Sequence, residues 1–228
     1  MSKARLRDAP HRPRSTPPPP VPRQFQQSRA QASYEKILEA ALALYAERGY
    51  DATQMPDIAE RAGMSVGGLY RYFRDKHQVF VELMHRRLEE NRLRQDAMIA
   101  AFEQAWADGD IDLRKTVRMV VEWTWSETYK APPDLLRAYM VMSFRDETFA
   151  ALRDQYDRYE RQALSRVIGK VVSKDRVPSA LATAKVIDLV VETLAVWSAL
   201  HRGAPSRGVK QATEEMVYCF LAPPHESG

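Results

Sequence analysis

The chain has 228 residues, 45% of them hydrophobic, and carries 34 Lys and Arg against 30 Asp and Glu, a formal charge of +4. This apolar content is enough for a folded core and excludes a wholly disordered chain. The single cysteine excludes a disulfide framework or a multi-cysteine zinc site and fits a reducing compartment. No apolar run reaches the ~20 residues of a membrane span, and the charged N-terminus lacks the apolar stretch of a secretory signal, so we expect a cytoplasmic protein without membrane contact.

The positive charge is concentrated at the N-terminus. Residues 1–30 hold seven basic side chains and one acidic one, whereas the rest of the chain nets −2. Half of the 14 prolines lie at or before Pro22. Because proline fixes φ and has no N–H to donate, and because this stretch has little to bury, we predict a disordered arm over residues 1–30.

The first predicted helix runs from about Ala32 to Arg48. Its apolar residues recur at the 3.6-residue period and form one stripe: Ile37, Ala40, Ala41, Leu44 and Tyr45. Ser33 is the expected N-cap, and Gly49 is expected to end the helix.

Two short helices follow, separated by a glycine. The spacing predicts the first over Thr53–Ala62, with Thr53 as its N-cap, and the second over Ser65–Phe73, with Gly63 in the turn between them. This arrangement favours a helix-turn-helix motif whose second helix enters the DNA major groove. The alternative is a helical hairpin of some other all-α protein.

The outward side of the second helix carries residues suited to DNA: Val66, Gly67, Gly68, Tyr70 and Arg71. The glycines leave the first-turn amides open to a phosphate. Tyr70 can donate to a phosphate or pack on a thymine methyl, and Arg71 can reach guanine or the backbone.

The stretch from Ser33 to Lys76, which ends in a Gly-x-Leu-Tyr-x-Tyr-Phe-x-x-Lys run over residues 67–76, resembles the DNA-binding domain of the TetR family of bacterial transcriptional regulators. The resemblance implies base or groove contacts at the five residues named above. It implies phosphate contacts at four more: Thr53, Ser65, Tyr72 and Lys76. Three residues depart from the family pattern: Tyr34 stands where arginine is common, His77 where glutamate is common, and Gly68 where threonine or another small residue is usual.

Six longer helices are predicted after the motif, and no alternating strand pattern is present. Their ranges are 76–107, 112–130, 133–143, 145–171, 178–202 and 207–221. We therefore predict an all-α protein of about nine helices. The expected division is a helix-turn-helix DNA-binding domain over 31–77, a ligand-binding and dimerisation domain over 78–221, and a disordered tail over 222–228.

The last two helices are predicted to join two copies of the chain. The segment 178–202 is apolar around most of its circumference, which is typical of a helix covered on two sides. The resemblance implies that this helix and the last one pair with their copies in a homodimer, which suits a palindromic operator. A buried core helix within a monomer is the alternative.

The middle of the chain is rich in large, soft side chains, which suit an adaptable pocket and are also ordinary core. The resemblance implies a pocket here whose ligand releases DNA. The candidate lining residues are Met98, Phe102, Met119, Trp123, Tyr129, Met140, Phe144 and Trp197. No charge pattern in the sequence singles out a polar ligand group, so a small hydrophobic effector is expected.

The sequence thus predicts a DNA-binding transcriptional regulator, most simply a repressor. It predicts no cofactor and no metal site, and no catalytic motif such as Gly-x-Ser-x-Gly or His-Glu-x-x-His is present, so an enzyme is not expected. An effector-independent nucleoid or adaptor protein on the same fold is the alternative. The basic arm either reaches phosphates or a minor groove or acts as a solubilising tail.

Overall fold

The computed structural model describes residues 28–174, 176–177, 179–201 and 206–222. The predicted arm at 1–30 and the predicted tail at 222–228 lie almost entirely outside these residues, except that the first helix begins at Ser28 and therefore includes 28–30. Within the described residues there are nine α-helices and no strand, as predicted: α1 Ser28–Ala52, α2 Met55–Arg61, α3 Val66–Leu69, α4 Lys76–Ala107, α5 Leu113–Lys130, α6 Pro133–Arg145, α7 Glu147–Val171, α8 Ala180–Leu200 and α9 Ser206–Leu221.

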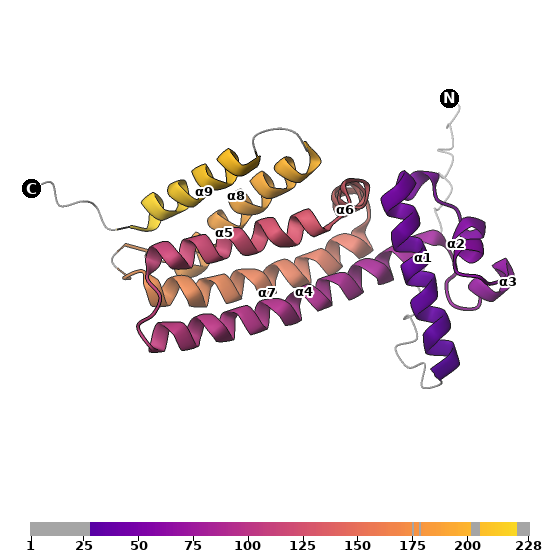
Figure 1. Cartoon of the computed structure of the whole chain (residues 1–228), viewed down its shortest axis with the longest axis horizontal. Helices are drawn as coiled ribbons and strands as arrows, with labels where there is room; N and C mark the ends of the chain where they lie inside the picture. Colours follow the sequence, from indigo (N-terminus) through magenta and orange to yellow (C-terminus); the bar gives the residue numbers. More distant parts are fainter. Residues whose placement is uncertain (1–27, 175, 178, 202–205, 223–228) are drawn as a thin grey trace, which may run out of the picture.

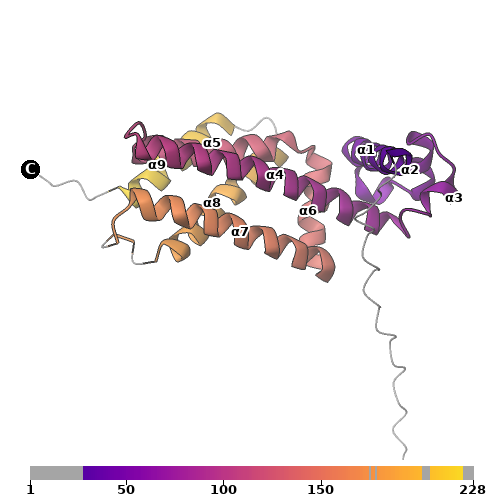
Figure 2. The ribbon, with the colours of Figure 1, turned by 90° about the horizontal axis from the view of Figure 1, so that it is seen from below.

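The helices form two groups joined by α4. Helices α1, α2 and α3 lie together at one end, and the long α4 runs from them into a bundle with α5, α7, α8 and α9 (Figure 1). A view from below shows α4 and α7 running along the same bundle, with α6 crossing at the end nearest α1 (Figure 2). The bounds of α4 to α9 lie within two residues of the predicted ranges. None of the described helices has the length and apolar character of a membrane span.

The predicted end of the first helix is confirmed at Gly49. Its φ of +81° lies in the left-handed region that glycine adopts without a steric penalty, and it interrupts the helical backbone of α1. The predicted apolar stripe faces the core, since Ile37, Ala41 and Tyr45 are fully buried. Gly49 thus interrupts the helix where the sequence indicates, but the helix begins at Ser28, so the predicted N-cap Ser33 lies inside it.

Two details of the predicted motif need correction. Helix α2 has Gln54 rather than Thr53 as its N-cap, and the Gln54 backbone N–H donates to Asp57 Oδ2 at 2.8 Å. Helix α3 ends at Leu69, not Phe73, and residues 70–72 continue as turns. A glycine pair lowers helix stability by about 1 kcal/mol per residue relative to alanine, which accounts for so short a helix.

One core joins the first three helices to the bundle. Phe73 and Leu69 are fully buried in it together with Phe80 of α4, Leu135 of α6 and Phe149 of α7. This core therefore crosses the predicted domain boundary at residues 77–78. At the same junction, His77 Nε2 lies 2.9 Å from Asp146 Oδ2, which caps the first turn of α7.

Candidate DNA-binding surface and ligand cavity

Helix α3 packs against the core along one side and is exposed along the other. Leu69 is fully buried on its inner side, and the Ser65 hydroxyl caps the helix by accepting the Gly68 N–H at 3.1 Å. On the outer side Val66 is 38% exposed and Tyr70 is 53% exposed, and Arg71 is exposed beside them. The arrangement presents a small, mixed apolar and basic surface.

The two glycines of α3 have different surroundings. A methyl group placed on Gly67 would meet no atom within 4 Å, whereas one on Gly68 would lie 3.2 Å from the capping Ser65 Oγ. The absence of a side chain at Gly67 therefore leaves the backbone of α3 accessible on its exposed face, although the fold itself does not require glycine there. Gly68 instead leaves room for the helix cap.

The predicted phosphate contact of Thr53 is not compatible with its position. Thr53 is fully buried, and its hydroxyl donates to the Gly49 carbonyl at 2.8 Å. Its side chain thus ties the end of α1 to the start of α2. The sequence pattern predicted Thr53 as a capping residue at the surface, because it does not distinguish such a hydroxyl from one that turns inward.

The Lys76 side chain also forms its hydrogen bonds within the protein. Its ammonium group donates to three carbonyl oxygens at the end of α1 and just beyond, those of Thr53 (2.9 Å), Tyr50 (3.0 Å) and Asp51 (3.1 Å). It also lies 4.5 Å from the centre of the Tyr50 ring. An ammonium has only three N–H donors, so none remains for a phosphate. The structure therefore corrects the predicted role of Lys76 from DNA contact to clamp.

Tyr72 is partly buried and packs against the core, whereas Ser65 is exposed and keeps its hydroxyl hydrogen available beside α3. Tyr34, where the family pattern favours arginine, is buried and stacks on Phe73 with ring centres 5.5 Å apart. Its hydroxyl donates to Glu82 of α4. Tyr34 thus adds a contact to the core.

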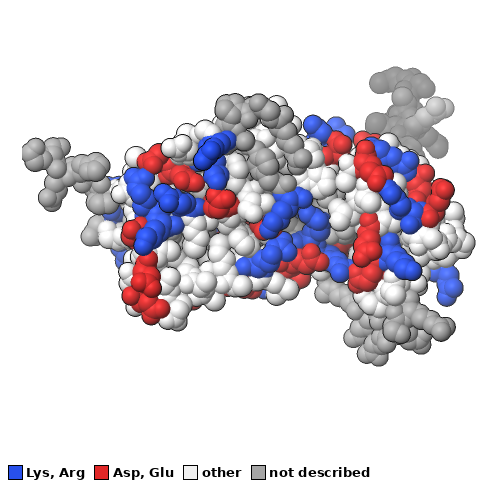
Figure 3. All heavy atoms as spheres, in the orientation of Figure 1, with Lys and Arg blue, Asp and Glu red and all other residues white. Residues whose placement is uncertain are grey.

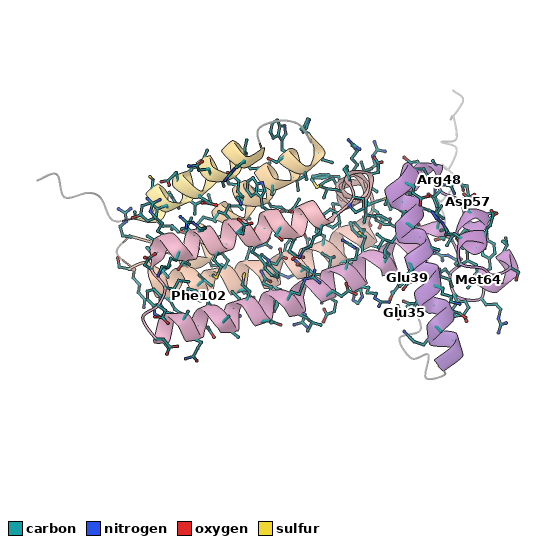
Figure 4. The ribbon with its side chains drawn as sticks, in the orientation of Figure 1. Glu35, Glu39, Arg48, Asp57, Met64 and Phe102 are labelled. Atoms are coloured by element: carbon teal, nitrogen blue, oxygen red, sulfur yellow. The ribbon has the colours of Figure 1, made fainter. Side chains whose placement is uncertain are left out.

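The charges around the motif are largely paired. Arg48 and Asp57 point toward each other from α1 and α2, 2.5 Å apart (Figure 4), and Arg61 pairs with Glu47. The Gln54 N–H and Arg48 lower the pKa of Asp57. On the face shown in Figure 3, blue and red side chains are interspersed over the α1 to α3 end. The motif therefore depends on local placement of a few exposed groups.

A second candidate site lies inside the bundle. Side chains from α4, α5, α6, α7 and α8 line a cavity of about 440 Å³. One part of its wall is apolar and aromatic, including Leu88, Trp123 and Tyr139. Six acidic and three basic side chains also line it, so the lining carries a net negative formal charge.

Four of the six acidic side chains come from α7 and α8: Asp157, Glu160, Asp188 and Glu192. Burial, together with their mutual repulsion, raises the pKa of Glu160 to about 8 and that of Asp188 to about 7. The pKa values of Asp157 and Glu192 are also raised, mainly by burial, although Arg153 opposes this effect for both. Arg153 lies 3.5 Å from each of these two carboxylates.

Comparison with known proteins agrees with the motif. Residues 37–83 match the family described as "Bacterial regulatory proteins, tetR family". The N-terminal domain belongs to the TetR family. The HTH-type transcriptional repressor KstR of Rhodococcus jostii is 48% identical to this chain over 55 residues, which cover 24% of this chain and 26% of KstR. The sequence match thus spans about a quarter of this relative's length.

Over most of the chain, the likeness to solved transcriptional regulators is one of fold. A transcriptional regulator from Saccharomonospora viridis, solved in complex with choline, superposes with a TM-score of 0.66 at 19% identity, covering 84% of this chain and 96% of its own. FadR from Bacillus subtilis, solved in complex with stearoyl-CoA, has a TM-score of 0.62 at 14% identity, covering 83% and 98%. These relatives are named as transcriptional regulators and not as enzymes.

Of the eight predicted pocket residues, Trp123 lines the cavity. Phe102 is buried in a separate core at the end of the bundle farthest from α3 (Figure 4), and Met98 and Met119 pack against that core. Met140 packs against Leu136, Val196 and Ala199. The prediction is wrong for these four because soft and aromatic side chains fill cores as readily as pockets.

Two further predicted pocket residues lie at the surface. Phe144 is 80% exposed at the end of α6, and Trp197 is 44% exposed on α8, where its ring stacks on His201. They do not line the cavity. Tyr129 belongs to α5, but its side chain lies outside the described residues.

The acidic part of the cavity was missed from the sequence, although a signal for it exists. Asp188 and Glu192 are four residues apart on the most apolar helix, so they share one face of a segment that is otherwise suited to burial. Charged residues in such a setting require a partner or a function. The pairing of this face with Asp157 and Glu160 depends on how α7 packs on α8, which the sequence does not specify.

Proposed function

We propose that the protein is a sequence-specific transcriptional regulator that represses genes by binding a palindromic operator and leaves it when a small molecule occupies the bundle cavity. The observation that carries the proposal is the exposed face of Val66, Tyr70 and Arg71 on a TetR-family helix-turn-helix. Relatives named as repressors support the direction of the effect. Neighbours solved with choline and with stearoyl-CoA support a ligand in the bundle but differ in its chemistry.

The path from cavity to DNA runs through shared side chains. Met84 of α4 and Leu135 of α6 line the cavity and also belong to the core beneath α1 and α3. A ligand that separates α4 from α6 would therefore shift the core on which the recognition helix rests. Closely packed cores move between discrete arrangements rather than deforming continuously, which suits such a switch.

Replacing Tyr70 with alanine should weaken operator binding about tenfold or more, since it removes an exposed aromatic ring that the fold does not use. The measurement is a gel shift on genomic fragments selected with the unaltered protein. Phe144→Ala, which removes an even more exposed ring at the far end of α6, is the matched control and should bind as the parent does. Equal affinity of the Tyr70→Ala variant and the parent would contradict the proposed role of this surface.

The proposed dimer uses α8 and α9, which lie side by side along one side of the bundle (Figure 1). Each helix leaves large apolar side chains about half exposed: Val186, Leu189 and Trp197 on α8, and Met216 and Phe220 on α9. Positions 186, 189 and 197 fall on one helical face, and position 216 is followed one turn later by 220. Exposed apolar stripes on adjacent helices favour burial against a second copy.

Leu189→Glu should convert this dimer into a monomer, raising the dissociation constant about 100-fold or more, because a carboxylate would be buried against an apolar surface. Sedimentation velocity over a concentration series measures the change. Val141→Glu alters a comparably exposed apolar residue on α6 and should leave the oligomeric state unchanged. A monomeric parent protein, or a dimer unaffected by Leu189→Glu, would refute the proposed interface.

A further inference from the structure

Two partly buried carboxylates in the cavity form no ion pair among the described residues. Among the described residues, neither Glu160 nor Asp188 has a Lys or Arg nitrogen within 4 Å of its carboxylate. The neighbouring Asp157 and Glu192 both form ion pairs with Arg153. Glu160 receives one hydrogen bond, from Asn91 Nδ2 at 3.3 Å. A carboxylate removed from water without a countercharge is unfavourable unless it is protonated or a bound cation compensates it.

Two uncharged side chains of the same lining have an amide oxygen that accepts no hydrogen bond. Gln95 is 8% exposed, and its Oε1 has no hydrogen-bond partner. Asn91, one turn earlier on α4, uses its amide nitrogen on Glu160 while its Oδ1 is also unpaired. Buried acceptors of this kind are normally satisfied, so the cavity offers unpaired acceptors that a ligand with N–H or polarised C–H groups would meet.

Other side chains of the same lining suit an apolar body. Leu88, Trp123 and Leu135 line it, and the Trp123 ring offers a π face that attracts a cation as well as an alkyl group. Within the described part of the chain, no set of three carboxylate, His or Cys side chains is arranged to hold a metal ion. The chemistry therefore favours an organic cation over a metal.

We infer that the cavity takes an amphipathic organic cation, an amine or quaternary ammonium whose charged group lies at Glu160 and Asp188 and whose apolar part lies against Leu88 and Trp123. This inference rests on the proposed function, because it names the chemical class of the effector for the same cavity. It replaces the expectation of a purely hydrophobic effector.

The protonation state of the empty site agrees with this assignment. The groups that face Glu160 and Asp188 are Asp157, Arg153 and Arg161 from α7, Glu192 from α8, and Asn91 from α4. The raised pKa values mean that protons partly neutralise the empty site near pH 7. A bound cation takes over this compensation and releases those protons, so its affinity should rise between pH 6 and pH 8.5.

The test uses three probes with the same eight-carbon chain: octyltrimethylammonium, octanol and octyl sulfate. Isothermal titration calorimetry on the purified full-length protein without DNA should show the cation binding at least tenfold more tightly than either of the others. Glu160→Gln combined with Asp188→Asn keeps the shape of the site but removes its charge, and should abolish that preference while octanol still binds. Glu147→Gln, an exposed acid on α7 outside the cavity, is the matched control and should retain it.

Equal or weaker binding of the cation would overturn the inference, as would a preference that survives in the doubly substituted variant. Binding of none of the probes would overturn it as well. Operator binding is measured separately by gel shift, so a protein that binds its operator but shows no preference for the cation refutes only the inference about the effector. A protein that binds the cation but selects no operator refutes the proposed function instead.

Discussion

Replacing Lys76 with methionine should lower the free energy of unfolding of the protein by about 2 kcal/mol and weaken operator binding through the fold of the DNA-binding helices. Three carbonyl oxygens at the end of α1 and just beyond it lose the hydrogen bond from the Lys76 ammonium in this variant. These carbonyls include helix-end groups that carry partial negative charge, which the ammonium offsets. Methionine retains the length of the side chain, so the loss reports the charge and hydrogen bonds.

The salt dependence of DNA binding separates this role from a phosphate contact. A lysine that contacts phosphate contributes about one unit to the slope of log affinity against log salt, and its loss would lower that slope without destabilising the fold. For Lys76→Met we expect an unchanged slope and a lower thermal midpoint. The control is Lys36→Met, which removes an exposed lysine of α1 and should change neither. A lower slope of log affinity against log salt at unchanged stability would show instead that Lys76 contacts a DNA phosphate.

The ligand-free protein should lose stability as the pH rises from about 6 to 8.5. The folded-state pKa values of Glu160, about 8, and Asp188, about 7, lie above the ordinary range of such groups. Between these limits the folded protein holds protons that the unfolded chain has released, so the free energy of unfolding falls with pH until the folded pKa is passed. Because the two groups are coupled, we expect a total of about 1–3 kcal/mol.

Thermal unfolding measured across this pH range tests the expectation. The midpoint should fall by several degrees between pH 6 and pH 8.5, given about 2–4 °C per kcal/mol for a chain of this size. Glu160→Gln should flatten the profile and raise the midpoint at pH 8.5, since glutamine carries no charge to bury. Glu147→Gln should leave the slope unchanged, because this residue lies exposed at the start of α7. A midpoint that rises with pH would show that the carboxylates are compensated in the empty protein.

The helix-turn-helix was predictable because its determinants are local. The stripe of Ile37, Ala41 and Tyr45 sets one helix face, and Gly49 and Gly63 mark the turns through positive φ values. These effects act over a few residues and do not depend on what packs opposite. The exposed positions of α3 follow from the same periodicity once Leu69 is taken as the buried residue.

Predicted roles failed where the packing of the fold, rather than the local sequence, sets the surroundings of a side chain. Thr53 and Lys76 both belong to the motif, but Lys76 reaches carbonyls 23 to 26 residues away, and Thr53 is covered by the packing around it. The sequence contains the same threonine or lysine whether its side chain faces a DNA phosphate or a backbone carbonyl. Only the fold determines which of these it meets.

The amino-acid sequence alone determined that this chain is all-α, that a helix-turn-helix precedes a longer helical region, and which positions of α3 face outward. Helix periodicity and glycine turns are local and can therefore be identified without a structure. The tertiary structure decided the effector site, since five helices contribute to the cavity and the packing of α7 on α8 places Glu160 beside Asp188. Packing partly removes these two carboxylates from water and gives them no ion-pair partner among the described residues. Burial of this kind is a property of the packed bundle rather than of any one helix in it.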